Sequence, residues 1–297
     1  MNRTILIMLM AGLVFGTCKK SEKKDDTPLL ALAYLMNSST CSTASSSTST
    51  GTTVSNNTAT LNTSTGCVTG VTSCMDSALP SWIKDNFKCA TGYVSGGNYV
   101  FKSQNVPNTK SSYYGTSSPL YEARTTTGPN PNTTSSQKLV YTIPSSPTRG
   151  TGTVSTQGGL ASIGITVNGL AIFNNAAAPP DLLTVEALTF DNYGGHPQNS
   201  GIYHHHAGAT KITNNDANLV GLILDGYAIY GKKCDNGTAT TADDFTPGDL
   251  DSLHGHTTKT IHFATATYHY HLAFDATATI DTLMGSFFYG NTGSVSN

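Results

Sequence analysis

The sequence predicts an all-β or β-rich domain, a sandwich or irregular barrel built from an internal duplication with pseudo-two-fold symmetry. Alternating runs of Val, Ile, Tyr and Thr, bounded by Asn-Gly, Asp-Gly, Gly-Gly and Pro-rich turns, dominate the later part of the chain. The ten residues 164–173 recur almost type for type at 221–230. Two copies of one half-buried unit cover each other's apolar faces most readily in a symmetric pairing, so we expect a two-fold axis between them.

The amino terminus resembles a bacterial lipoprotein signal peptide over residues 1–17. A positive start precedes an apolar run, 5–15, that is too short to span a bilayer, and Cys18 follows. Phe15 and Thr17 depart from the usual residues before such a cysteine, so an ordinary secretory signal without lipid is the alternative. Each buried methylene of an acyl chain on Cys18 adds about 0.8 kcal/mol of membrane affinity. We therefore expect a protein of the cell envelope, lipid-anchored to a bacterial membrane, with the outer membrane favoured.

Residues 18–75 are predicted to form a tether between the anchor and the domain. A charged segment, 19–26, is followed by a short apolar one, 28–36, which is far shorter than the ~20 residues of a membrane span and suits a docking segment. Ser and Thr make up most of residues 37–66. Such a segment buries too little apolar surface to offset the entropy lost on ordering. We expect a flexible spacer, with an interaction role as the alternative.

Residues 76–297 are long enough for one large domain. The Asn-Gly pair at 168–169 and the Asp-Gly pair at 225–226 predict type I′ hairpin turns, in which both central residues have positive φ. Helical periodicity is best at 81–89 and 181–188, each about two turns long.

Composition excludes two kinds of partner. Charged residues make up 11% of the chain, and the formal net charge is −2. A nucleic-acid surface or an electrostatic grip on anionic lipid needs clustered positive charge, so neither is indicated. The sequence also has no Ser or Cys nucleophile motif and no phosphate-binding loop. Apart from the lipid anchor, a small-molecule or protein partner is left open.

Cysteine usage fits an oxidising compartment. Setting the lipidated cysteine aside leaves five of the six, so at least one is unpaired or intermolecular. Our preferred pairing joins Cys67 with Cys74 and Cys89 with Cys234, which leaves Cys41 on the tether. None of the five has metal-ligand spacing with a histidine, so we expect them to be structural.

The histidines are the candidate functional residues. All nine lie between His196 and His271, and six occupy matching places in the two copies. These candidate metal ligands are His196, His204 and His206 in the first copy and His256, His269 and His271 in the second. Residues two apart on a strand share a face and lie roughly 6.6 Å apart, so one ion can take both imidazoles of a His-x-His. The upstream Gly-His adds a third nitrogen.

Three protein ligands and an open position form the arrangement of a catalytic zinc site, while imidazole also suits copper, iron and nickel. We expect zinc or copper, in two three-histidine sites or in one site shared across the two-fold. Two alternatives need no metal. In one, the imidazoles are structural and bond to the backbone and to tyrosine hydroxyls; in the other, a histidine is a catalytic base.

The strand pattern also predicts the surroundings of the second cluster. The face opposite its histidines carries Tyr268, Tyr270, Leu272 and Phe274, which we expect to form the core. The histidines then face away from the apolar layer into a polar cleft.

Other residues near the histidines have supporting roles in this interpretation. Asp191 and Asp251 occupy matching places and are candidates to orient a ligand histidine through its far N–H. A local turn or cap bond is the equal alternative for both. His205, His254 and His262 have no counterpart in the other copy, so we expect them to support the ligands or to be incidental.

Taken together, these motifs resemble the YHYH domain proteins over about residues 76–290. The sequence Tyr-His-Tyr-His stands intact at 268–271, while His205 replaces a tyrosine in the first copy. The other matching segments are 79–83, 143–144, 168–173, 195–197, 224–231, 250–251 and 255–256, together with both histidine clusters. The resemblance implies where the domain ends and where its site lies more than it names a reaction. The expected function is a membrane-anchored envelope lipoprotein that binds a transition metal, and the alternative is a metal-free surface binding or adhesive lipoprotein.

Overall fold

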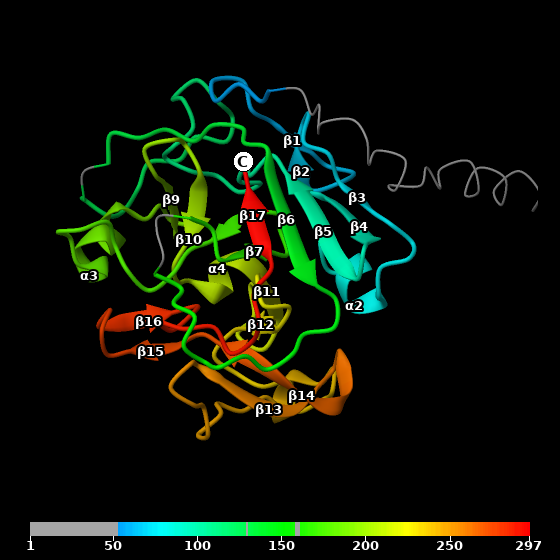
Figure 1. The fold of residues 1–297 in the computed structure, drawn as a ribbon. Helices are drawn as coiled ribbons and strands as arrows, with labels where there is room; N and C mark the ends of the chain where they lie inside the picture. Colours follow the sequence, from blue (N-terminus) through cyan, green and yellow to red (C-terminus); the bar gives the residue numbers. More distant parts are fainter. Residues whose placement is uncertain (1–52, 129, 158–160) are drawn as a thin grey trace, which may run out of the picture. The chain divides into compact units, whose positions relative to one another are not determined.

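The computed structural model describes residues 53–128, 130–157 and 161–297 (Figure 1). The expected signal peptide 1–17, the lipidation site Cys18 and the tether up to residue 52 lie outside the described residues, as does Cys41. Among the described residues, no helix has the length and apolar character needed to cross a membrane.

An eight-stranded sheet holds both copies of the repeat. In spatial order its strands are β13 (Gly255–Thr260), β14 (Phe263–His271), β12 (Ala228–Tyr230), β11 (Leu219–Ile223), β7 (Gly164–Thr166), β8 (Ala171–Ile172), β10 (Tyr203–His205) and β9 (Gly195–Pro197). The order from β13 inward matches the order from β9 inward, with each strand replaced by its repeat equivalent. Figure 1 shows β13 with β14 and β9 with β10 at opposite ends of this arrangement.

The two copies meet at the centre of the sheet, where β7 and β11 pair antiparallel. Ile165 lies opposite Leu222, its equivalent in the other copy, and the flanking pairs are related by the same symmetry. Gly164 and Gly221 occupy equivalent positions beside this pair. A Cβ on either would clash with a backbone carbonyl of the partner strand, so the close approach requires glycine. The duplication is therefore structural, with a pseudo-two-fold axis at the Ile165–Leu222 pair.

The hairpin turns differ from the predicted type. Gly169 and Gly226 have positive φ, of 76° and 89°, whereas Asn168 and Asp225 do not. The N–H of Gly169 donates to the carbonyl of Thr166, and the N–H of Thr166 donates to the carbonyl of Leu170, the residue that follows the turn. This is a type I turn closed by a glycine bulge, a three-residue hairpin loop that needs only one left-handed residue. The type I′ prediction is wrong in both copies.

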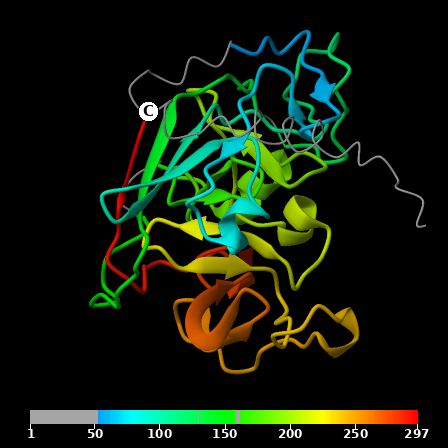
Figure 2. The ribbon, with the colours of Figure 1, turned by 90° about the vertical axis from the view of Figure 1, so that its right-hand side faces the viewer.

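A second, five-stranded sheet packs against the first and closes the core between them. Its order is β17 (Ser294–Ser296), β6 (Leu139–Pro144), β5 (Asn98–Ser103), β4 (Thr91–Ser95) and β3 (Cys74–Met75). Alternate residues of β6 are buried, and Tyr141 and Ile143 share one core with Ile165, Leu222 and Tyr270 of the larger sheet. Figure 2 shows the C-terminal strand in red beside β6 in green. The predicted β-rich, sandwich-like fold is confirmed, and neither of these two sheets closes on itself.

The described part of the expected tether, residues 53–75, packs on the domain. It forms β1 (Leu61–Asn62) and β2 (Cys67–Val68), and its Ala59 and Val68 join a buried apolar cluster with Val106, Tyr114 and Leu120. A few buried apolar side chains and a covalent link fix this Ser/Thr-rich segment to the domain. The spacer expected from the composition, which ran to residue 75, is therefore too long.

The covalent link is a disulfide between Cys67 and Cys89, with Cα atoms 5.4 Å apart. Cys74 is also disulfide-bonded, and Cys234 is a buried free thiol. The preferred pairing of Cys67 with Cys74 and of Cys89 with Cys234 is therefore wrong, because Cys67 is bonded to Cys89 and Cys234 is free.

Helices are short. The segment predicted at 81–89 forms one turn, α2 (Ser81–Lys84), and the segment at 181–188 forms α3 (Leu183–Glu186) followed by the 3-10 turn η2 (Ala187–Thr189). The helix α4 (Ala209–Thr213) and the turn η3 (Thr241–Asp243) were not predicted. A last pair of strands, β15 (Ala273–Asp275) and β16 (Ile280–Thr282), forms a small ribbon.

Candidate metal centres

Strand register brings three histidines of each copy onto one face of the sheet. In the first copy β9 and β10 pair antiparallel with His196 opposite His204, and in the second β13 and β14 place His256 opposite His269. The third histidine of each set follows two residues later on the same face. The six candidate ligands therefore form two clusters, one at each end of the larger sheet.

The two clusters are separate sites. The strands β10 and β14 are five inter-strand spacings apart, roughly 24 Å at about 4.8 Å per spacing. The donor atoms within each cluster lie within 4.8 Å of one another. One ion shared across the two-fold is therefore excluded, and the arrangement with one site in each copy remains.

In the first cluster, hydrogen bonds from the Nδ1 atoms of His204 and His206 hold the two rings so that their Nε2 atoms converge. Nδ1 of His204 bonds to the carbonyl of Ile202 at 3.0 Å, and Nδ1 of His206 bonds to that of Asn174 at 2.5 Å. Because a carbonyl only accepts, both Nδ1 atoms carry the hydrogen, and both Nε2 atoms present lone pairs. These two Nε2 atoms are 3.1 Å apart. Two lone pairs that face each other at this distance repel, and a cation bound between them would remove this repulsion.

The third imidazole of the first cluster belongs to His196. Its Nδ1 lies 2.6 Å from the hydroxyl of Thr189, and its buried Nε2 has no hydrogen-bond partner. Nearby, Oε1 of Glu186 lies 3.7 Å from that Nε2. An unpaired buried nitrogen is costly, so a donor or a metal ion is the missing partner.

The second cluster repeats this geometry. Nδ1 of His269 bonds to the carbonyl of Thr267 at 2.9 Å, and Nδ1 of His271 bonds to that of Gly231 at 2.8 Å. These acceptors are the repeat equivalents of those in the first cluster. Nε2 of His269 is again buried without a partner. Nε2 of His256 lies 3.3 Å from the hydroxyl of Thr258.

A cysteine that the sequence did not indicate completes the second cluster. Sγ of Cys234 lies 3.4 Å from Nε2 of His256 and 3.6 Å from Nε2 of His271. Ligands bound to one tetrahedral ion at about 2.0 to 2.3 Å are roughly 3.3 to 3.6 Å apart. The expectation that the cysteines are only structural did not foresee this place for Cys234, which belongs to a group of side chains that could hold a metal ion. Its lack of any sequence spacing to a histidine concealed it, because the loop after β12 brings it there.

Burial shapes the chemistry of these groups. The six histidines are at most 6% exposed, so they do not face an open polar cleft as predicted, although His196 lines a pocket. Burial holds the pKa of His196 and His204 well below the usual range and lowers that of His206 to about 4. It likewise lowers the pKa of His269 to about 4 and that of His271 to about 3. These imidazoles are neutral near pH 7, which is the form that ligates a metal.

The two predicted carboxylates have another partner. Asp191 accepts a hydrogen bond from the hydroxyl of Tyr203 at 2.9 Å, and Asp251 accepts one from that of Tyr268 at 3.1 Å. Each also accepts backbone N–H groups of its own turn. Their role in orienting a ligand histidine is therefore wrong, and the local turn bond is the correct alternative.

The group that orients the upstream histidine lies two residues earlier. Asp249 accepts a hydrogen bond from Nδ1 of His256 at 2.8 Å, and Thr189 occupies the equivalent place beside His196. The hydrogen bond from His256 lowers the pKa of the Asp249 carboxyl. The matching spacing of seven residues between each partner and its histidine is visible in the sequence, but Thr and Asp are unlike, which hid the equivalence.

Glycine before each upstream histidine has a packing reason. The ring of Tyr203 lies over Gly195, and that of Tyr268 lies over Gly255, so closely that a Cβ would clash with the tyrosine. Tyr268, Tyr270 and Leu272 are buried in the core as predicted. Phe274 is 65% exposed, so its assignment to the core is wrong, because it lies beyond the sheet on β15.

The remaining three histidines are not in the clusters. Nδ1 of His205 bonds to the carbonyl of Gly194 at 3.1 Å on the opposite face of β10. His254 lies 3.8 Å from Asp275, and Nδ1 of His262 lies 2.9 Å from the Tyr230 hydroxyl. Their expected absence from the ligand sets agrees with this placement.

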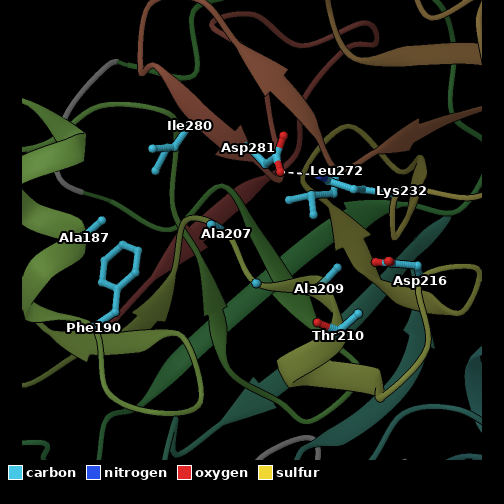
Figure 3. A pocket seen from close by; sticks show the side chains of 11 residues that line it. Ala187, Phe190, Ala207, Ala209, Thr210, Asp216, Lys232, Leu272, Ile280 and Asp281 are labelled. Atoms are coloured by element: carbon cyan, nitrogen blue, oxygen red, sulfur yellow. Dashed lines mark ion pairs between the residues drawn. The ribbon is translucent and has the colours of Figure 1, made fainter. Parts of the chain in front are cut away.

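Two pockets approach the first cluster. One, of about 460 Å³, is lined by His196, Glu186 and Thr189. The other, of about 420 Å³, is lined by Phe190 and by the ion pair of Lys232 with Asp281 (Figure 3). The Phe190 ring stacks on His206 at a centroid distance of 5.9 Å, so the second pocket meets the cluster through that ring. The first pocket reaches a candidate ligand directly.

Comparison with known proteins gives one match. The family model described as YHYH protein matches residues 140–247 and 244–285. These segments contain all six candidate ligands, Cys234 and both orienting residues. No curated protein and no solved structure matches the chain.

Proposed function

The chain is a YHYH domain protein, and we propose that this domain binds two transition-metal ions, zinc or copper, one in each half of its duplication. One observation carries the proposal. In each half three buried imidazoles bind a fixed acceptor or hydroxyl through Nδ1 and turn Nε2 toward a common point. Ligating histidines are held in this way in metalloproteins.

The donor sets fit the metals proposed. Imidazole nitrogen and thiolate sulfur are both ligands of zinc, and copper also accepts both ligand types. Burial raises the pKa of the Cys234 thiol to about 12, so a thiolate there needs the charge of a bound cation.

The metal-free structural alternative accounts for only one of the two ring nitrogens of each histidine. The Nδ1 atoms do bond to the backbone, as that alternative requires. The Nε2 atoms of His196 and His269 are buried and unpaired, however, and those of His204 and His206 face each other. A purely structural role gives these four nitrogen atoms no stabilising partner, so it does not explain why they are buried in this arrangement.

Metal analysis of the purified protein tests the proposal. The full-length product should carry two equivalents. Replacing His269 and His271 together by Ala should remove one of them, and replacing His204 and His206 together should remove the other. The control His262→Ala lies outside both clusters and should keep two. No change of metal content in either double variant would refute the proposal.

We further propose that the domain is held at the cell envelope by acylation of Cys18, with the chain up to about residue 52 as the spacer. The apolar run that ends just before this cysteine supports it. Intact-mass spectrometry of protein from a bacterial host should show a mature chain that begins with a lipidated Cys18, and Cys18→Ala should release it from the membrane fraction. A mature chain that starts elsewhere would contradict the anchor.

A further inference from the structure

We infer that the two metal centres differ in kind: the first holds an exchangeable position for a small external donor, water or a small anion, while the second is closed by four protein ligands. This inference rests on the proposed metal binding. The first centre is then the one that binds an external ligand from solution.

The fourth protein ligand is present in only one copy. The acceptor carbonyls of Asn174 and Gly231 are equivalent, since they bind equivalent nitrogens of His206 and His271. Three residues after Gly231 stands Cys234, and three residues after Asn174 stands Ala177. A methyl group cannot ligate, so the first cluster has three donors where the second has four.

A pocket also borders the first cluster. The pocket of about 460 Å³ has His196 in its wall, and the unpaired Nε2 of this residue is the atom that would bind the ion. Glu186 lines the same pocket, and its buried Oε2 has no hydrogen-bond partner. A small donor bound to the ion from this pocket would lie within reach of that carboxyl group.

Two aromatic rings that do not line this pocket pack on the first cluster. Phe173 stacks on His204 at a centroid distance of 3.8 Å, and Phe190 packs edge-on against His196 at 4.8 Å. A polar ligand would therefore approach the ion from the pocket that Glu186 lines. Three protein ligands with one open position are the arrangement in which a metal exchanges its fourth ligand.

Cobalt substitution with azide as the probe tests the inference. The variant with His269 and His271 replaced by Ala keeps only the first centre, and the variant with His204 and His206 replaced keeps only the second. Azide should shift the visible cobalt spectrum saturably in the former and leave it unchanged in the latter. If neither variant binds cobalt, the proposed function itself fails. If both bind it and azide acts on both or on neither, only the inference fails.

Exchange of the fourth ligand gives a reciprocal test. Ala177→Cys should abolish the azide response of the first centre and add a thiolate-to-cobalt charge-transfer band. Cys234→Ala should remove that band from the second centre and give it an azide response. If azide binds to the first centre only after Glu186→Gln, then Glu186 itself fills the position and the inference is overturned.

Discussion

Sγ of Cys234 lies 3.4 Å from Nε2 of His256, although 22 residues separate them in the chain. The thiol has no disulfide partner and is buried. With the two other imidazoles of the second copy it forms a four-donor set. The first copy has the same three imidazoles without the thiol, so the duplication conserves the histidine geometry but not the number of candidate ligands.

Asp249 should tune the second centre, while Asp251 should only stabilise the fold. Asp249→Asn weakens the acceptor for Nδ1 of His256 and should lower metal affinity at this centre by about 10- to 100-fold. The matched variant Asp251→Asn weakens bonds to Tyr268 and to its own turn, and should lower the free energy of unfolding by about 1–3 kcal/mol. Chelator competition measures the affinities. A larger affinity loss in Asp251→Asn would reverse this assignment.

The disulfide between Cys67 and Cys89 should contribute to stability. It closes a loop with a sequence separation of 22 residues, for which restriction of the unfolded chain predicts about 3 kcal/mol. Chemical denaturation of the double variant with both cysteines replaced by Ala should show a loss of that order. Peptide mapping under non-reducing conditions is the control. A peptide that links Cys67 to Cys74 would contradict the pairing.

Acid should destabilise the metal-free protein through His205. Burial lowers the pKa of this residue to about 4, against about 6.5 in an unfolded chain. Between these values the unfolded chain binds a proton that the folded chain does not, so the free energy of unfolding falls as pH drops from about 6.5 to about 4. His205 therefore contributes stability above pH 6.5 that is lost through this window.

Denaturation of wild type and His205→Gln at several pH values isolates this contribution. The stability of the variant should fall less steeply between about pH 6.5 and about pH 4 than that of the wild type. Equal slopes for the two proteins would show that His205 does not titrate in this window.

Local patterns predicted the duplication and the six histidines, because both follow from short-range regularities. The i and i+2 spacing of His204 and His206 fixes their common face on any strand. The repeat then fixed the equivalence of the two sets, and the structure placed its axis at Ile165 and Leu222.

Long-range placement was beyond the sequence. Cys234 reaches the second cluster through a loop, and no residue spacing encodes that approach. Asp249 and Asp251 are both near His256 in sequence, but only the conformation of the turn decides which one meets the imidazole. For residues 53–75, a few buried side chains such as Ala59 outweighed the Ser/Thr-rich composition.

Crystallographic anomalous scattering at the absorption edge of the bound metal tests the central claim most directly. We expect two peaks, one within about 2.1 Å of Nε2 of His196, His204 and His206, and the other equally close to Nε2 of His256, His269 and His271. The second peak should also lie about 2.3 Å from Sγ of Cys234. Crystals of metal-loaded protein with no peak at either cluster, or with the metal bound elsewhere, would contradict it.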